Sequence, residues 1–154
     1  SRRISVTSPY FVPDQAIMYA LRAATARGVD VELFVSETGD KPMVYDAQRS
    51  YYEALLRAGV RIFMFKPPYI LHSKHFTIDD SIAVVGSSNM DQRSFNLNME
   101  VSMVVRGAGF VRQLDEVNAY YHDNSRELTL EEWQKQPLRS QLFDGLFRLT
   151  SALQ

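Results

Sequence analysis

Two kinds of apolar pattern alternate along the chain and predict its elements. Short apolar runs rich in β-branched and aromatic residues predict strands at residues 4–8, 29–35, 60–65 and 100–105. Apolar residues at helical spacing predict helices at residues 13–26, 43–58 and 110–121. Because strands that alternate with helices form sheets with covered faces, we expect an α/β fold: a mixed, mainly parallel β-sheet flanked by helices.

Proline and glycine mark where these elements begin and end. Pro13 suits the first turn of the first helix, and Gly28 and Gly59 follow the ends of the first two helices. Two further helices are predicted at residues 129–136 and 138–152. The last one carries an apolar stripe, which we interpret as a docking face for its own domain, for another part of the protein or for a membrane surface: Leu142, Phe143, Leu146, Phe147 and Leu149.

A hairpin is predicted in the middle of the chain. Residues 70–78 form a run typical of a strand, residues 79–81 are a turn signal, and residues 82–85 form a second apolar run. The two strands of a hairpin run side by side in opposite directions. The chain after residue 85 therefore returns to the place where the first strand began.

This hairpin contains the most informative pattern in the chain. His72 and Lys74 are followed, after four residues, by Asp79 and, after six more, by Gly-Ser-Ser-Asn at residues 86–89. Six residue types in this register arise by chance in about one sequence per million, given average amino-acid usage. The chain contains one copy of the pattern.

The spacing suits phosphodiester chemistry. Residues two apart on a strand share a face, so His72 and Lys74 project together, with Ser73 and His75 on the opposite face. The return of residues 86–89 adds hydroxyl, amide and backbone N–H donors, including the side chains of Ser87 and Asn89. An imidazole can attack phosphorus or move a proton, while an ammonium and neutral donors hold the phosphate oxygens. Asp79 and Gly86 are interpreted as structural, since Asp79 falls in the turn.

Other side chains in the chain receive plainer interpretations. His75 is predicted to face away from the motif, and His122 lies late on an amphipathic helix, so both are interpreted as packing or surface residues. Arg93 follows the motif and can meet a lipid phosphate or a neighbouring carboxylate. Several aromatics near strand ends are interpreted as packing residues that can together wall an acyl-chain groove: Tyr10, Phe11, Tyr45, Tyr51, Tyr52 and Tyr69.

Composition sets limits on the kind of protein. The 154 residues are 45% hydrophobic and 23% charged, which predicts a single globular domain over residues 1–154. A net charge of -1 without a basic run argues against a nucleic-acid partner. The lack of cysteine excludes disulfides and thiolate metal sites, and is typical of a cytosol-facing domain. The chain lacks an initiator Met and enters a strand almost at once, so we expect it to be part of a longer protein.

The motif and its flanks resemble a known family. The pattern at residues 72–89 resembles the phospholipase D superfamily. Five flanking stretches resemble the C-terminal half of bacterial cardiolipin synthases, which carries the second such motif: residues 7–14, 27–31, 49–53, 58–62 and 91–100. The resemblance covers almost the whole chain. One departure is His75, where a plain apolar strand residue is expected.

The resemblance implies half of a metal-independent and cofactor-free phosphatidyltransferase. Such an enzyme joins two phosphatidylglycerol molecules into cardiolipin through a phosphatidyl-histidine, with one histidine from each of two motifs. It leaves open whether His72 is the nucleophile or the acid and base. It also implies that the carboxylate of Glu100 hydrogen-bonds the motif histidine. The implied partners are phosphatidylglycerol, the surface of the bacterial cytoplasmic membrane, and either the missing N-terminal motif half or a second copy in a homodimer.

Two alternatives remain open from the sequence. In a phospholipase D-like hydrolase or nuclease, water replaces the lipid hydroxyl as the acceptor. In a non-catalytic half, the domain supplies only an interface or a membrane contact. The flanking stretches and the slightly acidic charge argue against the first alternative, and the intact His72, Lys74 and Asn89 argue against the second.

Overall fold

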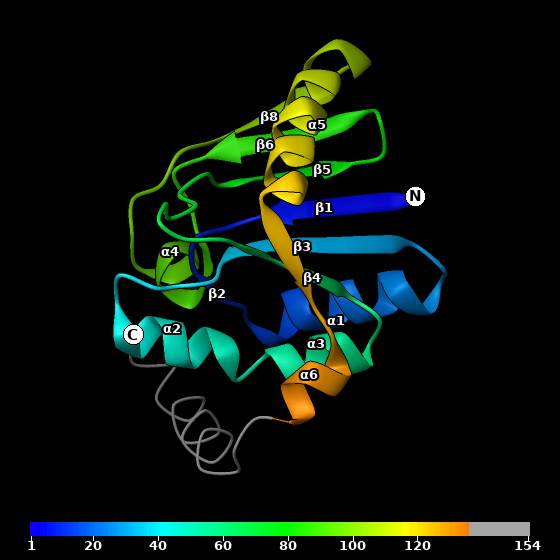
Figure 1. Ribbon diagram of the computed structural model, residues 1–154. Helices are drawn as coiled ribbons and strands as arrows, with labels where there is room; N and C mark the ends of the chain where they lie inside the picture. Colours follow the sequence, from blue (N-terminus) through cyan, green and yellow to red (C-terminus); the bar gives the residue numbers. More distant parts are fainter. Residues whose placement is uncertain (136–154) are drawn as a thin grey trace.

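A seven-stranded sheet organises the chain in the computed structural model, which describes residues 1–135 (Figure 1). The strands lie in the order β8-β6-β5-β1-β3-β4-β9. Their bounds are β1 (Arg3–Thr7), β3 (Asp30–Ser36), β4 (Arg61–Phe65), β5 (His75–Ile78), β6 (Ile82–Gly86), β8 (Ser102–Arg106) and β9 (Ser125–Leu128). The α/β fold with a mixed sheet flanked by helices is therefore confirmed.

The parallel part of the sheet is smaller than the sequence predicted. β1 pairs in parallel with β3, and β3 with β4, whereas the neighbours β1–β5, β5–β6, β6–β8 and β4–β9 are antiparallel. Parallel pairs need a long crossover, which the helical connections between β1, β3 and β4 supply. The tight hairpin between β5 and β6 makes that pair antiparallel.

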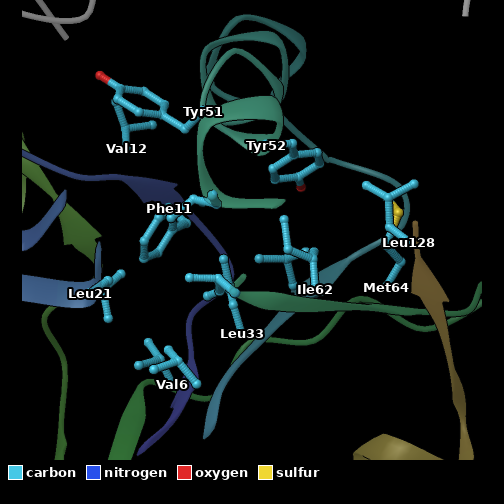
Figure 2. Close-up of a cluster of buried hydrophobic side chains, with 14 of the residues drawn as sticks. Val6, Phe11, Val12, Leu21, Leu33, Tyr51, Tyr52, Ile62, Met64 and Leu128 are labelled. Atoms are coloured by element: carbon cyan, nitrogen blue, oxygen red, sulfur yellow. The ribbon is translucent and has the colours of Figure 1, made fainter. Parts of the chain in front are cut away.

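Each face of the sheet packs against helices through alternate strand residues. On one face, Leu33 and Ile62 pack in a buried cluster with residues of α1 (Gln15–Ala26), α3 (Tyr52–Arg57) and α6 (Leu130–Gln134) (Figure 2). On the other face, Phe34 and Phe63 form a smaller cluster against Tyr121 of α5 (Ala108–Asp123), which crosses the sheet in Figure 1. Burying apolar side chains contributes about 25 cal/mol per Å², so these two clusters are the main source of stability.

The predicted helix at residues 43–58 is two helices. α2 (Pro42–Arg49) ends at Ser50, and α3 begins after Tyr51. The Ser50 hydroxyl donates to the Ala47 carbonyl at 2.6 Å and so competes with the helical pattern. The break allows Tyr51 and the first residue of α3 to be buried together in the core.

Several short elements lack a clear sequence signal. β2 (Phe11–Val12) pairs in parallel with β7 (Met90–Asp91), and α4 (Gln92–Asn96) follows directly where a loop was expected. β9 covers the outer edge of β4. The short α6 lies within the helix predicted at residues 129–136, and the helix predicted at 138–152, with its apolar stripe, lies outside the described residues. Between residues 1 and 135, none of the helices has the length and apolar character needed to cross a membrane.

The hairpin of β5 and β6 forms as predicted, and Asp79 lies in its turn. Asp79 has a positive φ of 50°, a conformation that Asp tolerates better than most residues. Its carboxylate accepts hydrogen bonds from the backbone N–H groups of Arg2 at 2.6 Å and Arg3 at 3.0 Å, which lower the pKa of the carboxyl. The turn is thereby joined to the start of β1, at the opposite end of β5 from His72.

Candidate active site

Two loops meet at the end of the sheet where β1 and β6 finish. The parallel pair β2–β7 joins the loop after β1 to the loop after β6. The hydroxyl of Ser8 accepts a hydrogen bond from the Met90 N–H at 3.1 Å and donates one to the Tyr10 carbonyl at 2.6 Å. Figure 1 shows β2, α2 and α4 gathered at this end of the sheet. The motif loop is therefore held against a second loop from the start of the chain.

His72 and Lys74 lie side by side, but they precede the strand. β5 begins only at His75, so the prediction of a strand from residue 70 is wrong for the first five residues. The Lys74 Nζ atom lies 3.2 Å from Nδ1 of His72 and 2.9 Å from the His72 carbonyl oxygen. The pairing partner β1 ends at Thr7, which leaves residues 72–74 without a neighbouring strand on that side. The two side chains meet through this direct contact rather than through strand geometry.

The backbone at Gly86 returns beside the backbone of Lys74, as the hairpin predicted. The Gly86 N–H donates to the Lys74 carbonyl at 3.1 Å, and the Ser87 N–H donates to the Val101 carbonyl at 2.9 Å. A Cβ atom at Gly86 would lie 2.4 Å from that same carbonyl oxygen, so this position needs glycine. We call His72, Lys74 and residues 86–89 the motif mouth.

Glu100 lies beside the motif mouth and contacts it through Ser87. Its carboxylate accepts hydrogen bonds from the hydroxyl of Ser87 and the amide of Asn98, both of which lower the pKa of Glu100. Within the described residues, no hydrogen bond joins Glu100 to His72, so the contact implied by the resemblance is not made. Glu100 lies in the loop before β8, where its carboxylate accepts the hydrogen bond from Ser87 instead.

Lys74 supplies the positive charge of the motif mouth. Partial burial lowers the pKa of its ammonium, while the negative charges of Glu100 and Asp91 act in the opposite direction. A partly buried ammonium that is only weakly attracted to nearby carboxylates can bind a phosphate oxygen instead.

Asn89 is one of the residues that line an open pocket of about 370 Å³. Its side-chain oxygen is buried and has no hydrogen-bond partner within residues 1–135. An unsatisfied buried polar atom costs free energy and is often found at functional sites. The polar side chains that line the pocket with Asn89 come from four segments of the chain: Tyr10, Lys41, Asp91, Gln92, Arg93 and Asn98.

The other two histidines lie away from the motif mouth, as predicted. His75 is buried, and its Nε2 atom lies 2.9 Å from the side-chain oxygen of Asn118 on α5. Burial lowers the pKa of His75, and the hydrogen bond to Asn118 acts against that shift. His122 is half exposed near the end of α5, with its ring centroid 4.8 Å from that of Phe63.

Most of the aromatic residues near strand ends serve packing. Phe11, Tyr51 and Tyr52 are buried in the larger core cluster, and the Tyr45 hydroxyl donates to the Glu37 carbonyl. Tyr69 is 72% exposed. These positions do not form one continuous apolar wall, so the acyl-chain groove is not supported for this set as a whole.

Lys41 and Asp91 join the site without a comparable sequence signal. Lys41 lies in the polar loop after β3, and Asp91 caps α4 by accepting a hydrogen bond from the Ser94 N–H at 2.6 Å. Loops at the carboxyl ends of parallel strands commonly hold ligands, which is the one rule that points to Lys41. Throughout residues 1–135, no group of three His, Cys, Asp or Glu side chains is arranged to hold a metal ion.

Comparison with known proteins supports the sequence resemblance. Residues 1–120 match the family described as "Cardiolipin synthase, PLD-like domain". The chain is 38% identical over 153 residues to cardiolipin synthase A of Pseudomonas putida, covering 99% of this chain and 32% of that protein. It is 36% identical over 152 residues to cardiolipin synthase A of Proteus mirabilis, covering 31% of that protein. The chain thus spans about a third of the length of these relatives.

Solved structures share the fold at lower identity. Nuc from Salmonella typhimurium, a phospholipase D family member, superposes with a TM-score of 0.72 and 23% identity over 83% of this chain and 82% of that one. Phosphatidylserine synthase of Haemophilus influenzae superposes with a TM-score of 0.76 and 13% identity, covering 99% of this chain and 40% of that one. At these identities the likeness establishes the fold alone.

Proposed function

The chain belongs to the family of phospholipase D-like domains of cardiolipin synthases, and from this we propose that it is the C-terminal motif half of a phosphatidyltransferase. On this proposal, residues 1–154 form one domain. The complete enzyme joins two phosphatidylglycerol molecules into cardiolipin and releases glycerol. No metal or cofactor takes part.

One observation carries the proposal: the contact between Lys74 and His72 at the return of residues 86–89. It joins an imidazole to an ammonium, and the backbone of Gly86, at the start of the Gly-Ser-Ser-Asn stretch, is hydrogen-bonded to the same Lys74. A phosphate diester needs this pair of groups, because its oxygens gain charge as a fifth ligand approaches phosphorus. Lys74, Ser87 and Asn89 hold the non-bridging oxygens, and His72 acts on the reacting bond.

The first step transfers the phosphatidyl group to the enzyme. A ring nitrogen of one motif histidine forms a bond to phosphorus, and the bond from phosphorus to the glycerol oxygen breaks. The second motif histidine gives its proton to that departing oxygen. A phosphatidyl-histidine and free glycerol result. His72 takes one of these two roles, and the histidine of the other half takes the second.

The second step returns the phosphatidyl group to an alcohol. The free hydroxyl of another phosphatidylglycerol gives its proton to the second histidine, and its oxygen forms a bond to phosphorus. The bond from phosphorus to the nucleophilic histidine breaks. Cardiolipin leaves, and both imidazoles regain their starting protonation. Glu100 supports this cycle by holding Ser87 and by placing a negative charge near Lys74.

The second histidine comes from another half of the protein or from a second copy of this one. Beside the motif mouth, the chain from α4 into the edge strand β8 exposes several apolar side chains: Leu97, Met99, Val101, Met103 and Val104. We call these residues the apolar strip. Exposed apolar surface next to an incomplete site favours a protein partner or a membrane surface as its cover. We propose that the bacterial cytoplasmic membrane supplies the substrate and that this domain faces the cytosol.

The test is a product assay on the full-length enzyme. Labelled phosphatidylglycerol in vesicles is incubated with enzyme, and the products are separated. We expect cardiolipin and glycerol as the main products. Phosphatidic acid as the main product would show that water is the acceptor and would replace the transferase proposal with a hydrolase.

A further inference from the structure

The pocket beside Asn89 contains two cations that the chemistry of the motif mouth does not use. Lys41 lies above the ring of Tyr10, with its Nζ atom 5.1 Å from the ring centroid. Arg93 lies on α4 and is exposed. Across the described part of the chain, neither side chain forms a salt bridge.

The carboxylate nearest to Lys41 in sequence is already engaged. Asp40 accepts a hydrogen bond from the Tyr10 hydroxyl at 2.8 Å. Burial and this bond raise the pKa of Tyr10 to about 12, so its hydroxyl stays protonated and keeps donating to Asp40. Lys41 thus lies over the aromatic ring and lines the open pocket. Two cations lining such a pocket favour an anionic ligand.

Asp91 connects this pocket to the motif mouth. One of its carboxylate oxygens caps α4, while its charge acts on both Lys74 and Tyr10. Asn89 also belongs to both the pocket and the motif mouth. A ligand in the pocket therefore meets a carboxylate and an amide as well as two cations. Carboxylates and amides recognise hydroxyl groups, whereas lysine and arginine recognise phosphate.

We propose that this pocket binds the phosphoglycerol headgroup of the acceptor phospholipid. The free glycerol hydroxyls lie at Asp91, and the acceptor's own phosphate lies at Lys41 and Arg93, while Asn89 holds the phosphate under attack. The acceptor of the proposed reaction carries a phosphate three carbons from its attacking hydroxyl, so it offers a hydroxyl to the carboxylate and a phosphate to the two cations. The inference rests on the proposed function and adds to it the selection of an anionic alcohol over a neutral one.

The experiment compares how much of the phosphatidyl group passes from the enzyme to each of two acceptors. Full-length enzyme acts on labelled phosphatidylglycerol vesicles with ethanol added as a neutral alcohol, and cardiolipin and phosphatidylethanol are counted. Both products come from the same phosphatidyl-enzyme, so their ratio reports only on the acceptor step. We expect the Lys41→Gln/Arg93→Gln enzyme to lower the ratio of cardiolipin to phosphatidylethanol by about tenfold, the effect of losing two charge contacts.

A matched charge change elsewhere is the control. The Arg57→Gln/Lys135→Gln enzyme removes the same two kinds of charge from α3 and the end of α6, outside the pocket. It should keep the parent ratio. An unchanged ratio in the Lys41→Gln/Arg93→Gln enzyme would overturn the pocket assignment while leaving the proposed function intact. A parent enzyme that makes no cardiolipin would overturn both.

A second measurement needs only the parent enzyme. Glycerol 3-phosphate offers the same hydroxyl and phosphate groups as the acceptor headgroup, and free glycerol offers the hydroxyls alone. We expect glycerol 3-phosphate to lower the cardiolipin to phosphatidylethanol ratio at concentrations where glycerol does not. Equal effects of the two compounds would contradict a phosphate contact in the pocket, even if the double variant failed to fold.

Discussion

The ammonium of Lys74 lies 3.2 Å from Nδ1 of His72. An ammonium can only donate a hydrogen bond, so Nδ1 accepts and a neutral imidazole carries its proton on Nε2. In this arrangement neither nitrogen of the neutral His72 ring has a free lone pair. To protonate departing glycerol, His72 must first take up a proton at Nδ1, and to attack phosphorus through Nε2 its proton must move from Nε2 to Nδ1. In either role the hydrogen bond from Lys74 to Nδ1 breaks.

Replacing His72 tests the central assignment. We expect His72→Ala in the full-length enzyme to abolish turnover while the fold is kept, since a nucleophile or its proton partner has no substitute here. Cardiolipin formation is measured together with circular dichroism. His122→Ala, on α5 and away from the motif mouth, is the control and should stay active. Activity of His72→Ala above about 10% of the parent would refute a catalytic role for His72.

Glu100 is expected to matter through charge. Glu100→Gln keeps the size of the side chain but removes the negative charge near Lys74 and weakens the hydrogen bond from Ser87. We expect a fall in kcat of about tenfold or more with an unchanged fold. Glu116→Gln, on the exposed face of α5, is the matched control. A rate within about twofold of the parent would return Glu100 to the role of a surface residue.

Activity is expected to be independent of divalent metal ions. The motif mouth offers one imidazole, an ammonium, hydroxyls and an amide, which together are a poor ligand set, and Lys74 supplies the positive charge. Full-length enzyme dialysed against EDTA should keep its rate of cardiolipin formation. Loss of activity that one equivalent of a divalent ion restores would contradict this mechanism.

The buried His75 should make stability depend on pH. Burial lowers its pKa in the folded state below the ordinary value of 6.5. As the pH falls through 6.5, the unfolded chain binds a proton before the folded chain does, so stability decreases until the folded pKa is passed. Urea unfolding midpoints at pH 7.5, 6.5 and 5.5 measure this loss.

The variant His75→Gln isolates the contribution of that imidazole. It lacks the titrating group but can still hydrogen-bond Asn118, so we expect it to lose less stability than the parent over the same pH range. Identical pH profiles for the parent and His75→Gln would contradict a lowered pKa.

The chain alone should be inactive or very weakly active as a monomer, because two imidazoles must act at one phosphorus. Two copies related by a two-fold axis can bring His72 to His72, and the apolar strip offers a weak contact for this. Light scattering and a phosphodiesterase assay over one concentration series should show activity rising with the dimer fraction. Full activity in a strictly monomeric sample would refute the paired-histidine mechanism for this chain.

Local patterns in the sequence predicted much of the fold and the hairpin that holds the motif. The apolar runs predicted β1, β3, β4 and the β5–β6 hairpin to within one or two residues, apart from the early start given to β5. Periodicity works here because alternation and helical spacing are set by neighbours a few residues apart. The motif spacing likewise predicted that the chain at Gly86 returns beside Lys74, since a hairpin closes over a short stretch of chain.

Only the tertiary structure decided which distant residues complete the site. Tyr10 meets Asp40 thirty positions away, and Asp91 acts on Lys74 from a different loop. The carboxylate of Glu100 hydrogen-bonds Ser87 rather than His72, because the loop before β8 packs against Gly86. Contacts of this kind depend on how the ends of separate strands converge, which no local period encodes. The sequence therefore determined the family and predicted that His72 and Lys74 lie together, and the fold alone brought Lys41, Asn89, Asp91 and Arg93 to one pocket.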